Sequence, residues 1–72
     1  MSYITKKDLE NWFTYHLPKP GQQEKYVAIR DKAKEFAELI VLLAPDCIDT
    51  TVAIRHLRET VMIVNQAIAC YS

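Results

Sequence analysis

Aromatic rings and an imidazole crowd one short stretch near the start of the sequence. Trp12, Phe13, Tyr15 and His16 occupy four of five consecutive positions, and Pro18 follows closely. Such rings stack on planar ligands such as nucleobases, and their polar edges form hydrogen bonds. Trp12 and Phe13 also fit a hydrophobic lid over other elements. Tyr15 and His16 stand where a helix is expected to end, so stacking on a ligand is a role for Tyr15 in particular.

Cations form a second group of residues that could do chemistry. They are Lys25, Arg30, Lys32 and Lys34, with acidic residues dispersed among them. The ordinary interpretation is a solvated helix face with salt bridges. The alternative is an anion pocket, because the first half of a helix favours negative charge and Arg30 could hold a phosphate through two parallel hydrogen bonds. A second copy of the chain would double that charge.

Signatures of catalysis or metal binding are absent from the sequence. It has one glycine, so glycine-rich phosphate loops are excluded, and its two histidines, His16 and His56, belong to different segments. Cys47 and Cys70 fall near opposite ends of one expected helix, about 34 Å apart at ~1.5 Å per residue, too far for a disulfide. We therefore predict buried, reduced thiols, no metal, no cofactor and no enzymatic activity.

Length and charge narrow the possible partners. The 72 residues suffice for one domain, spanning 1–72, and nine basic residues balance nine acidic ones. No overall field would draw the protein to DNA or to an anionic membrane. The sequence offers no apolar run of signal-peptide or membrane-spanning length. We expect a soluble protein of the cytoplasm.

Capping and breaking residues predict an all-α fold with helices at about 5–15, 22–44 and 47–70. Thr5 followed by Asp8 is typical of a helix start, whereas Pro18, Pro20 and Gly21 form a linker. Pro45 should end the second helix, with Asp46 capping the third. A short N-terminal helix would thus precede a long, antiparallel two-helix hairpin.

Apolar residues at steps of three and four predict the packing seam of this hairpin. The expected seam consists of Tyr26, Ile29, Ala33, Phe36, Ile40 and Leu43 on one helix and Ile54, Leu57, Val61, Val64 and Ile68 on the other. Half of all residues are hydrophobic, and many lie off this seam. A short N-terminal helix cannot cover them all, so we predict a homo-oligomer. Asn65, a polar residue in an apolar stretch, could form a hydrogen bond across the interface between subunits.

Four segments together resemble the phage anti-CBASS cyclic-oligonucleotide sponge family, whose hairpin domain is shared with anti-Thoeris sponges. They are WFTYHLP, GQQEKYVAIRDKAKEFAELI, AIRHLRETVM and NQAIAC, and they cover nearly the whole chain. The resemblance implies a phage protein that acts in the host bacterial cytoplasm. Such a protein would sequester cyclic dinucleotides, and in some members also cyclic trinucleotides, without cleaving them. It also implies a homo-oligomer, a hexamer in typical members, with pockets between subunits.

The same resemblance assigns roles to individual residues. Tyr15 would stack on a base and Arg30 would contact a phosphate. The full set of ligand-binding candidates is Tyr15, Arg30, His16, Lys34, Tyr26 and Phe13. Two alternatives stay open, a sponge for the cyclic ADP-ribose isomers of Thoeris and a hairpin module that binds a protein partner through its off-seam apolar face.

Overall fold

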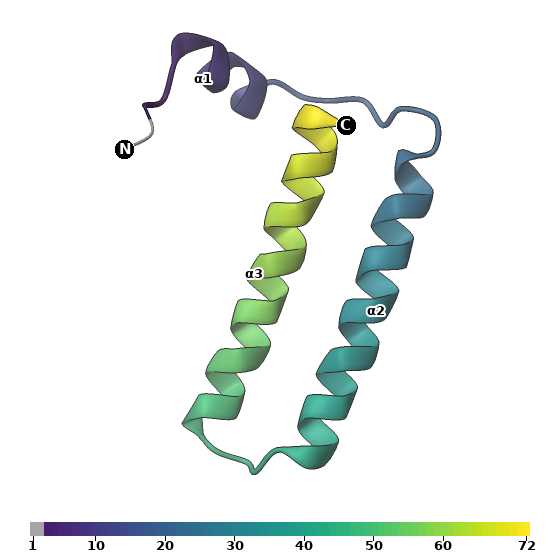
Figure 1. Ribbon diagram of the computed structural model, residues 1–72, viewed down its shortest axis with the longest axis vertical. Helices are drawn as coiled ribbons and strands as arrows, with labels where there is room; N and C mark the ends of the chain where they lie inside the picture. Colours follow the sequence, from purple (N-terminus) through teal and green to yellow (C-terminus); the bar gives the residue numbers. More distant parts are fainter. Residues whose placement is uncertain (1–2) are drawn as a thin grey trace.

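The computed structural model describes residues 3–72, and this part of the chain contains three helices and no strand. They are α1 (Lys6–Phe13), α2 (Gln22–Leu43) and α3 (Ile48–Tyr71). Helices α2 and α3 run side by side in opposite directions, and α1 lies at the end of the hairpin where α3 finishes (Figure 1). The expected all-α fold with an antiparallel hairpin is confirmed.

The first helix begins as predicted and ends two residues early. Asp8 N donates to Thr5 Oγ1 over 3.1 Å and Thr5 N donates to Asp8 Oδ2 over 3.0 Å, which forms a reciprocal capping box. Thr14 already has extended backbone angles (φ −101°, ψ 140°), and its hydroxyl donates to the Glu10 carbonyl. The predicted range 5–15 was therefore too long, and Tyr15 lies on the linker.

A short turn joins α2 to α3, and its cap differs from the prediction. The N-cap of α3 is Cys47, with extended angles (φ −152°, ψ 172°), and not Asp46. The Cys47 side chain makes no capping hydrogen bond to the helix backbone. Thr50 Oγ1 instead donates to the Pro45 carbonyl over 2.6 Å and ties the first turn of α3 to the loop.

The hairpin seam follows the predicted positions throughout α3 and departs from them in α2. Phe36 and Leu43 are 54% and 73% exposed, while Ala37 and Ala44 are half-buried in their place. At about 100° per residue, position 37 lies closer than position 36 to the stripe through Ala33. Small alanines therefore face α3, and the larger side chains are left on the outside.

Residues 3–72 form no closed hydrophobic core. Its extents are 44 × 33 × 17 Å, so its smallest dimension is less than the width of two helices with side chains. Among the described residues no apolar side chain is fully buried, and Val41, Leu42, Ile48 and Ile63 are each more than 60% exposed.

The two free thiols also depart from the prediction, because Cys47 is exposed and Cys70 is only half-buried.

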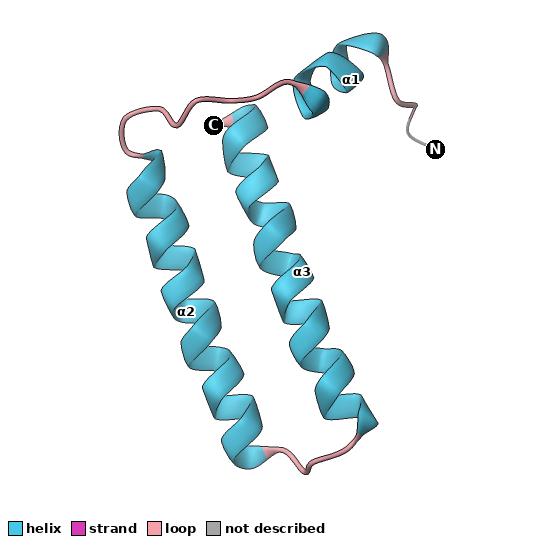
Figure 2. Ribbon diagram, turned by 180° about the vertical axis from the view of Figure 1, so that it is seen from behind, coloured by secondary structure: helices cyan, strands magenta, loops and turns pink. Residues whose placement is uncertain are grey.

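Gln22 closes the open end of the hairpin. Its side chain is 3% exposed, accepts a hydrogen bond from Lys19 N at 2.9 Å, and donates to the Ile68 carbonyl at 3.0 Å. The residue before it, Gly21, has φ 86°, a left-handed conformation that side chains disfavour. The linker thus turns at Gly21 and is fastened to the last turns of α3 by Gln22. Seen from behind, the loop between α1 and α2 passes the C-terminal end of α3 (Figure 2).

A helix that crosses a bilayer needs about 20 mostly apolar residues. Within residues 3–72 no helix combines that length with sufficient apolar character.

Candidate ligand-binding groove

Three cations from two helices line one groove of the hairpin. Arg30 and Lys34 are one turn apart on α2, and Arg58 reaches the same groove from α3. The groove has a volume of about 380 Å³. Its remaining lining is apolar, from Ala33, Ala37, Ile54, Leu57, Val61 and Met62. An apolar floor with positive charges at its rim suits a ligand that combines flat rings with phosphates.

Arg58 is a member of this groove that sequence reasoning missed. It is not among the ligand-binding candidates named from the sequence. The rotation of α3 about its axis determines where Arg58 lies. Leu57 and Val61 face α2, so the neighbouring Arg58 lies at the edge of the groove. The seam positions, which the sequence does show, are the signal that could have located it.

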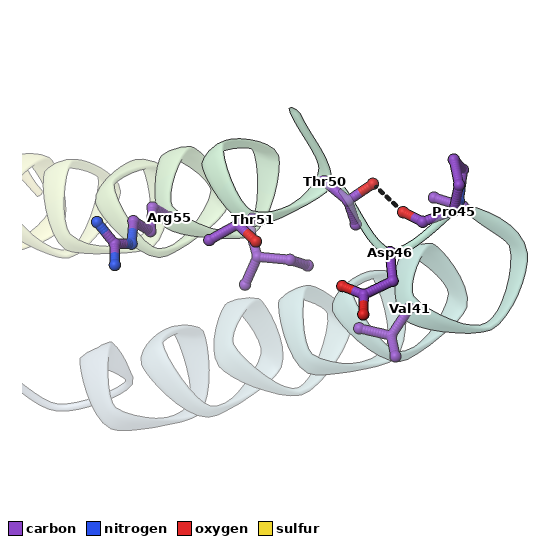
Figure 3. A pocket seen from close by; sticks show the side chains of 8 residues that line it. Val41, Pro45, Asp46, Thr50, Thr51 and Arg55 are labelled. Atoms are coloured by element: carbon purple, nitrogen blue, oxygen red, sulfur yellow. Dashed lines mark hydrogen bonds between the residues drawn. The ribbon is translucent and has the colours of Figure 1, made fainter. Parts of the chain in front are cut away.

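The groove continues toward the turn. Lys34 and Ile54 also line a hollow of about 590 Å³ together with Val41 and Leu42, and Ile54 and Val41 line a further hollow of about 600 Å³ at the turn itself. Figure 3 shows the turn hollow, with the Thr50 hydroxyl directed at the Pro45 carbonyl. One face of the hairpin is therefore hollowed from Arg30 to the turn.

The aromatic candidates of the N-terminal segment lie elsewhere. Tyr15 is 80% exposed on the linker and Phe13 is 83% exposed at the end of α1. Neither contributes to the groove around Arg30, whose lining comes from α2 and α3 alone. Of the two residues that fitted a lid, Phe13 points into solvent, whereas Trp12 is 36% exposed and contacts Tyr71 at the end of α3. One chain thus brings Arg30 and Lys34 together and keeps Tyr15 apart from them.

His16 and Tyr26 occupy two further environments. His16 is half-buried, with Nε2 2.6 Å from the Asn11 carbonyl, so its ring is held by α1. Tyr26 lines a separate hollow of about 430 Å³ with Met62 and Asn65. The Oδ1 atom of Asn65 is buried without a hydrogen-bond partner among the described residues. An acceptor left in this state costs about 1–3 kcal/mol.

The Cys47 thiol at the start of α3 has a pKa below its ordinary value. The Thr50 side chain lowers the pKa of the Cys47 thiol, helped by the backbone N–H groups of Thr50 and Asp49. Residues 3–72 contain no group of three or more His, Cys, Asp or Glu side chains arranged to hold a metal ion. The groove itself offers a ligand three cations and an apolar surface.

The sequence matches a known protein family over most of its length. The chain matches the family model described as the Acb2/Tad1 hairpin domain over residues 5–69, which leaves out only a few residues at each end. Neither the curated proteins nor the solved structures gave a significant match. The resemblance inferred from the sequence is confirmed, and the chain belongs to the Acb2/Tad1 hairpin-domain family, whose role is that of an anti-defence sponge for cyclic nucleotides.

Proposed function

We propose that this protein binds cyclic dinucleotides, sequesters them without cleavage and so keeps them from the effectors of CBASS immunity. The observation that carries the proposal is the groove in which Arg30, Lys34 and Arg58 surround an apolar floor. A cyclic dinucleotide presents two phosphodiesters and two flat bases, which need cations and apolar or aromatic surfaces respectively. The family role favours binding without chemistry.

The active species is a homo-oligomer, for which we propose the hexamer of typical family members. A folded monomer of 8.3 kDa should expose about 4,600 Å², and this chain exposes 6365 Å². The difference, about 1,800 Å² per chain, corresponds to the large interfaces of obligate oligomers. The radius of gyration of 15.5 Å likewise exceeds the ~11 Å expected of a compact chain of this length. Copies of the hairpin would supply the missing core.

The ligand site is shared between copies. Tyr15 is exposed on the linker and Arg30 lies in a groove that Tyr15 does not line. A neighbouring subunit that packs along the hairpin face would bring its own Tyr15 segment to the groove, so that a ring and the cations meet on one ligand. Phe13 and Tyr26 are further rings for such a site, and His16 is a weaker candidate because its Nε2 is already engaged.

Isothermal titration calorimetry tests the proposal. The purified protein is titrated with a panel of cyclic dinucleotides, cyclic trinucleotides and cyclic ADP-ribose isomers, and ligand released by heat is then identified by chromatography. We expect a dissociation constant in the nanomolar range, about −12 kcal/mol, for at least one dinucleotide, with intact ligand recovered. A cleaved product would contradict sequestration.

Variants connect binding to the site. Arg30→Ala and Tyr15→Ala should each abolish tight binding while the helical circular dichroism is kept. Lys32→Ala is the matched control, because the Lys32 side chain is 82% exposed and forms only a surface ion pair with Glu35 at 3.2 Å. Binding of ADP-ribose isomers alone would favour the Thoeris alternative. No binding of any ligand by the wild-type protein would favour the protein-interaction module.

The proposed place of action is the cytoplasm of a bacterium infected by a phage that encodes the protein. Cyclic nucleotide signals act there, and a sponge must meet them before their effectors do. Expression of the protein in a host with an active CBASS system should restore plaque formation by a sensitive phage, and Arg30→Ala should remove this protection.

A further inference from the structure

A reciprocal pair of hydrogen bonds joins α1 to the last turn of α3. The Asn11 side-chain Nδ2 donates to the Cys70 carbonyl over 3.2 Å, and the Cys70 Sγ donates to the Asn11 carbonyl over 3.6 Å. Each side chain thus contacts the backbone of the other residue, although the two are 59 positions apart in the sequence. Both residues are half-buried, so water competes less with these contacts than at an open surface.

Two more side chains complete this cluster. His16 Nε2 lies 2.6 Å from the same Asn11 carbonyl and 3.8 Å from Cys70 Sγ. Gln66 Nε2 donates to Cys70 Sγ over 3.0 Å. The thiol therefore stands at the centre of a polar cluster that consists of Asn11, His16, Gln66 and Cys70, with contributions from α1, the linker and α3.

The cluster bears directly on Tyr15. Helix α1 has ended before this residue, and Tyr15 is 80% exposed, so its position depends on the chain around it. Its next neighbour, His16, is held by Asn11 and lies against Cys70. Since Cys70 belongs to α3, the cluster holds the start of the linker in place relative to the hairpin.

We propose that Cys70 is a positioning residue for Tyr15. It does not touch the ligand. It fixes, through Asn11 and His16, the point from which the Tyr15 ring reaches a ligand held by the hairpin cations. This inference rests on the proposed sponge function for its consequence in binding, but the positioning itself exists in the ligand-free protein and can be measured there.

Fluorine NMR of the protein labelled with 3-fluorotyrosine tests the positioning without ligand. The sequence has four tyrosines, and loss of one signal in Tyr15→Phe identifies the Tyr15 resonance. Cys70→Ala should shift or broaden this resonance, and Cys70→Ser, which keeps a donor of similar size, should restore it. Cys47→Ala is the matched control, because it makes the same change at the opposite end of α3, where the thiol is exposed. An unchanged Tyr15 resonance in Cys70→Ala would overturn the proposal.

Binding provides the second measurement, with cyclic di-AMP and 3′,3′-cyclic GMP–AMP as probes, well below the unfolding temperature. Loss of one hydrogen-bonding group should weaken binding by about five- to tenfold in Cys70→Ala. We expect less than a twofold change in Cys70→Ser and in Cys47→Ala. A purely structural role would lower the thermal midpoint of Cys70→Ala and leave affinity unchanged, which would contradict the proposal.

The two measurements separate the two proposals. If the wild-type protein binds neither probe and the Tyr15 resonance still responds to Cys70→Ala, the sponge function for these dinucleotides fails and the positioning by Cys70 stands. If the wild-type protein binds and neither the resonance nor the affinity responds, the sponge function stands and the role of Cys70 is refuted.

Discussion

The indole Nε1 of Trp12 donates a hydrogen bond of 2.8 Å to the phenol oxygen of Tyr71. This bond fastens the helix that precedes the linker to the last residue of α3. It lies beside the contact between Asn11 and Cys70, so α1 is attached to the hairpin by side chains at two adjacent positions. Helix α1 has only 8 residues and could not persist alone in water, which makes this attachment necessary.

Removing the hydroxyl group of Tyr71 should loosen α1. In Tyr71→Phe the indole loses its acceptor, and we expect a loss of about 0.5–1 kcal/mol together with easier access of solvent to Trp12. Trp12 is the only tryptophan, so its intrinsic fluorescence and acrylamide quenching report on α1 directly. Tyr3→Phe is the control, since Tyr3 is 75% exposed. Equal quenching in both variants would show that the bond does not hold α1.

Gln22 should be among the most sensitive positions of the chain. Gln22→Leu removes the acceptor of Lys19 N and the donor to the Ile68 carbonyl, and we expect a loss of about 2 kcal/mol. The neighbouring Gln23 is exposed, and Gln23→Leu should change stability by less than 0.5 kcal/mol by the ordinary behaviour of surface sites. Thermal midpoints must be compared at one protein concentration, because oligomerisation shifts them. Similar midpoints for the two variants would refute the role of Gln22.

The Cys47 thiol should ionise more readily than an ordinary thiol. The Thr50 hydroxyl donates to the Pro45 carbonyl while Cys47 is neutral, but it lies 3.5 Å from Cys47 Sγ and can turn to donate to the thiolate once the thiol ionises. This lowers the pKa of the thiol, so alkylation of Cys47 should reach half its maximal rate at a lower pH than that of a free thiol. Thr50→Val removes the side-chain donor and should move this midpoint to higher pH. The measurement is the rate of iodoacetamide labelling against pH in a Cys70→Ser background. If the midpoint is the same in Thr50→Val as in the parent protein, the Thr50 hydroxyl does not lower the pKa, and the backbone N–H groups of Thr50 and Asp49 account for it.

Arg58 should matter for the ligand as much as Arg30 does. Both line the groove, and loss of either cation removes a partner for the phosphates, so Arg58→Ala should weaken dinucleotide binding by at least tenfold. Lys32→Ala is again the control, because the Lys32 side chain is 82% exposed and does not line the groove. Affinity should also fall as salt rises, and this dependence should be shallower in Arg58→Ala. An affinity equal to that of the wild-type protein would place the phosphates outside this groove.

Sequence alone determined what depends on neighbours along the chain. The capping box of Thr5 and Asp8, the break at Pro18 to Gly21 and the seam of α3 from Ile54 to Ile68 were all predicted, because caps, turns and helical periodicity act over a few residues. Family membership also followed from short segments. The early end of α1 and the N-cap position of α3 at Cys47 were missed, since helix ends depend on small differences in backbone energy.

Tertiary structure decided which distant residues meet. Two features depend on how far each helix is rotated about its own axis when the two pack together. Ala37 lies in the seam in place of Phe36, and Arg58 lines the same groove as Arg30. The contact between Asn11 and Cys70 depends on where the linker returns α1 after the hairpin has formed. These relationships come from packing over distances of 20 to 60 residues in sequence, where no local rule operates, and they assemble the groove and position the segment that carries Tyr15.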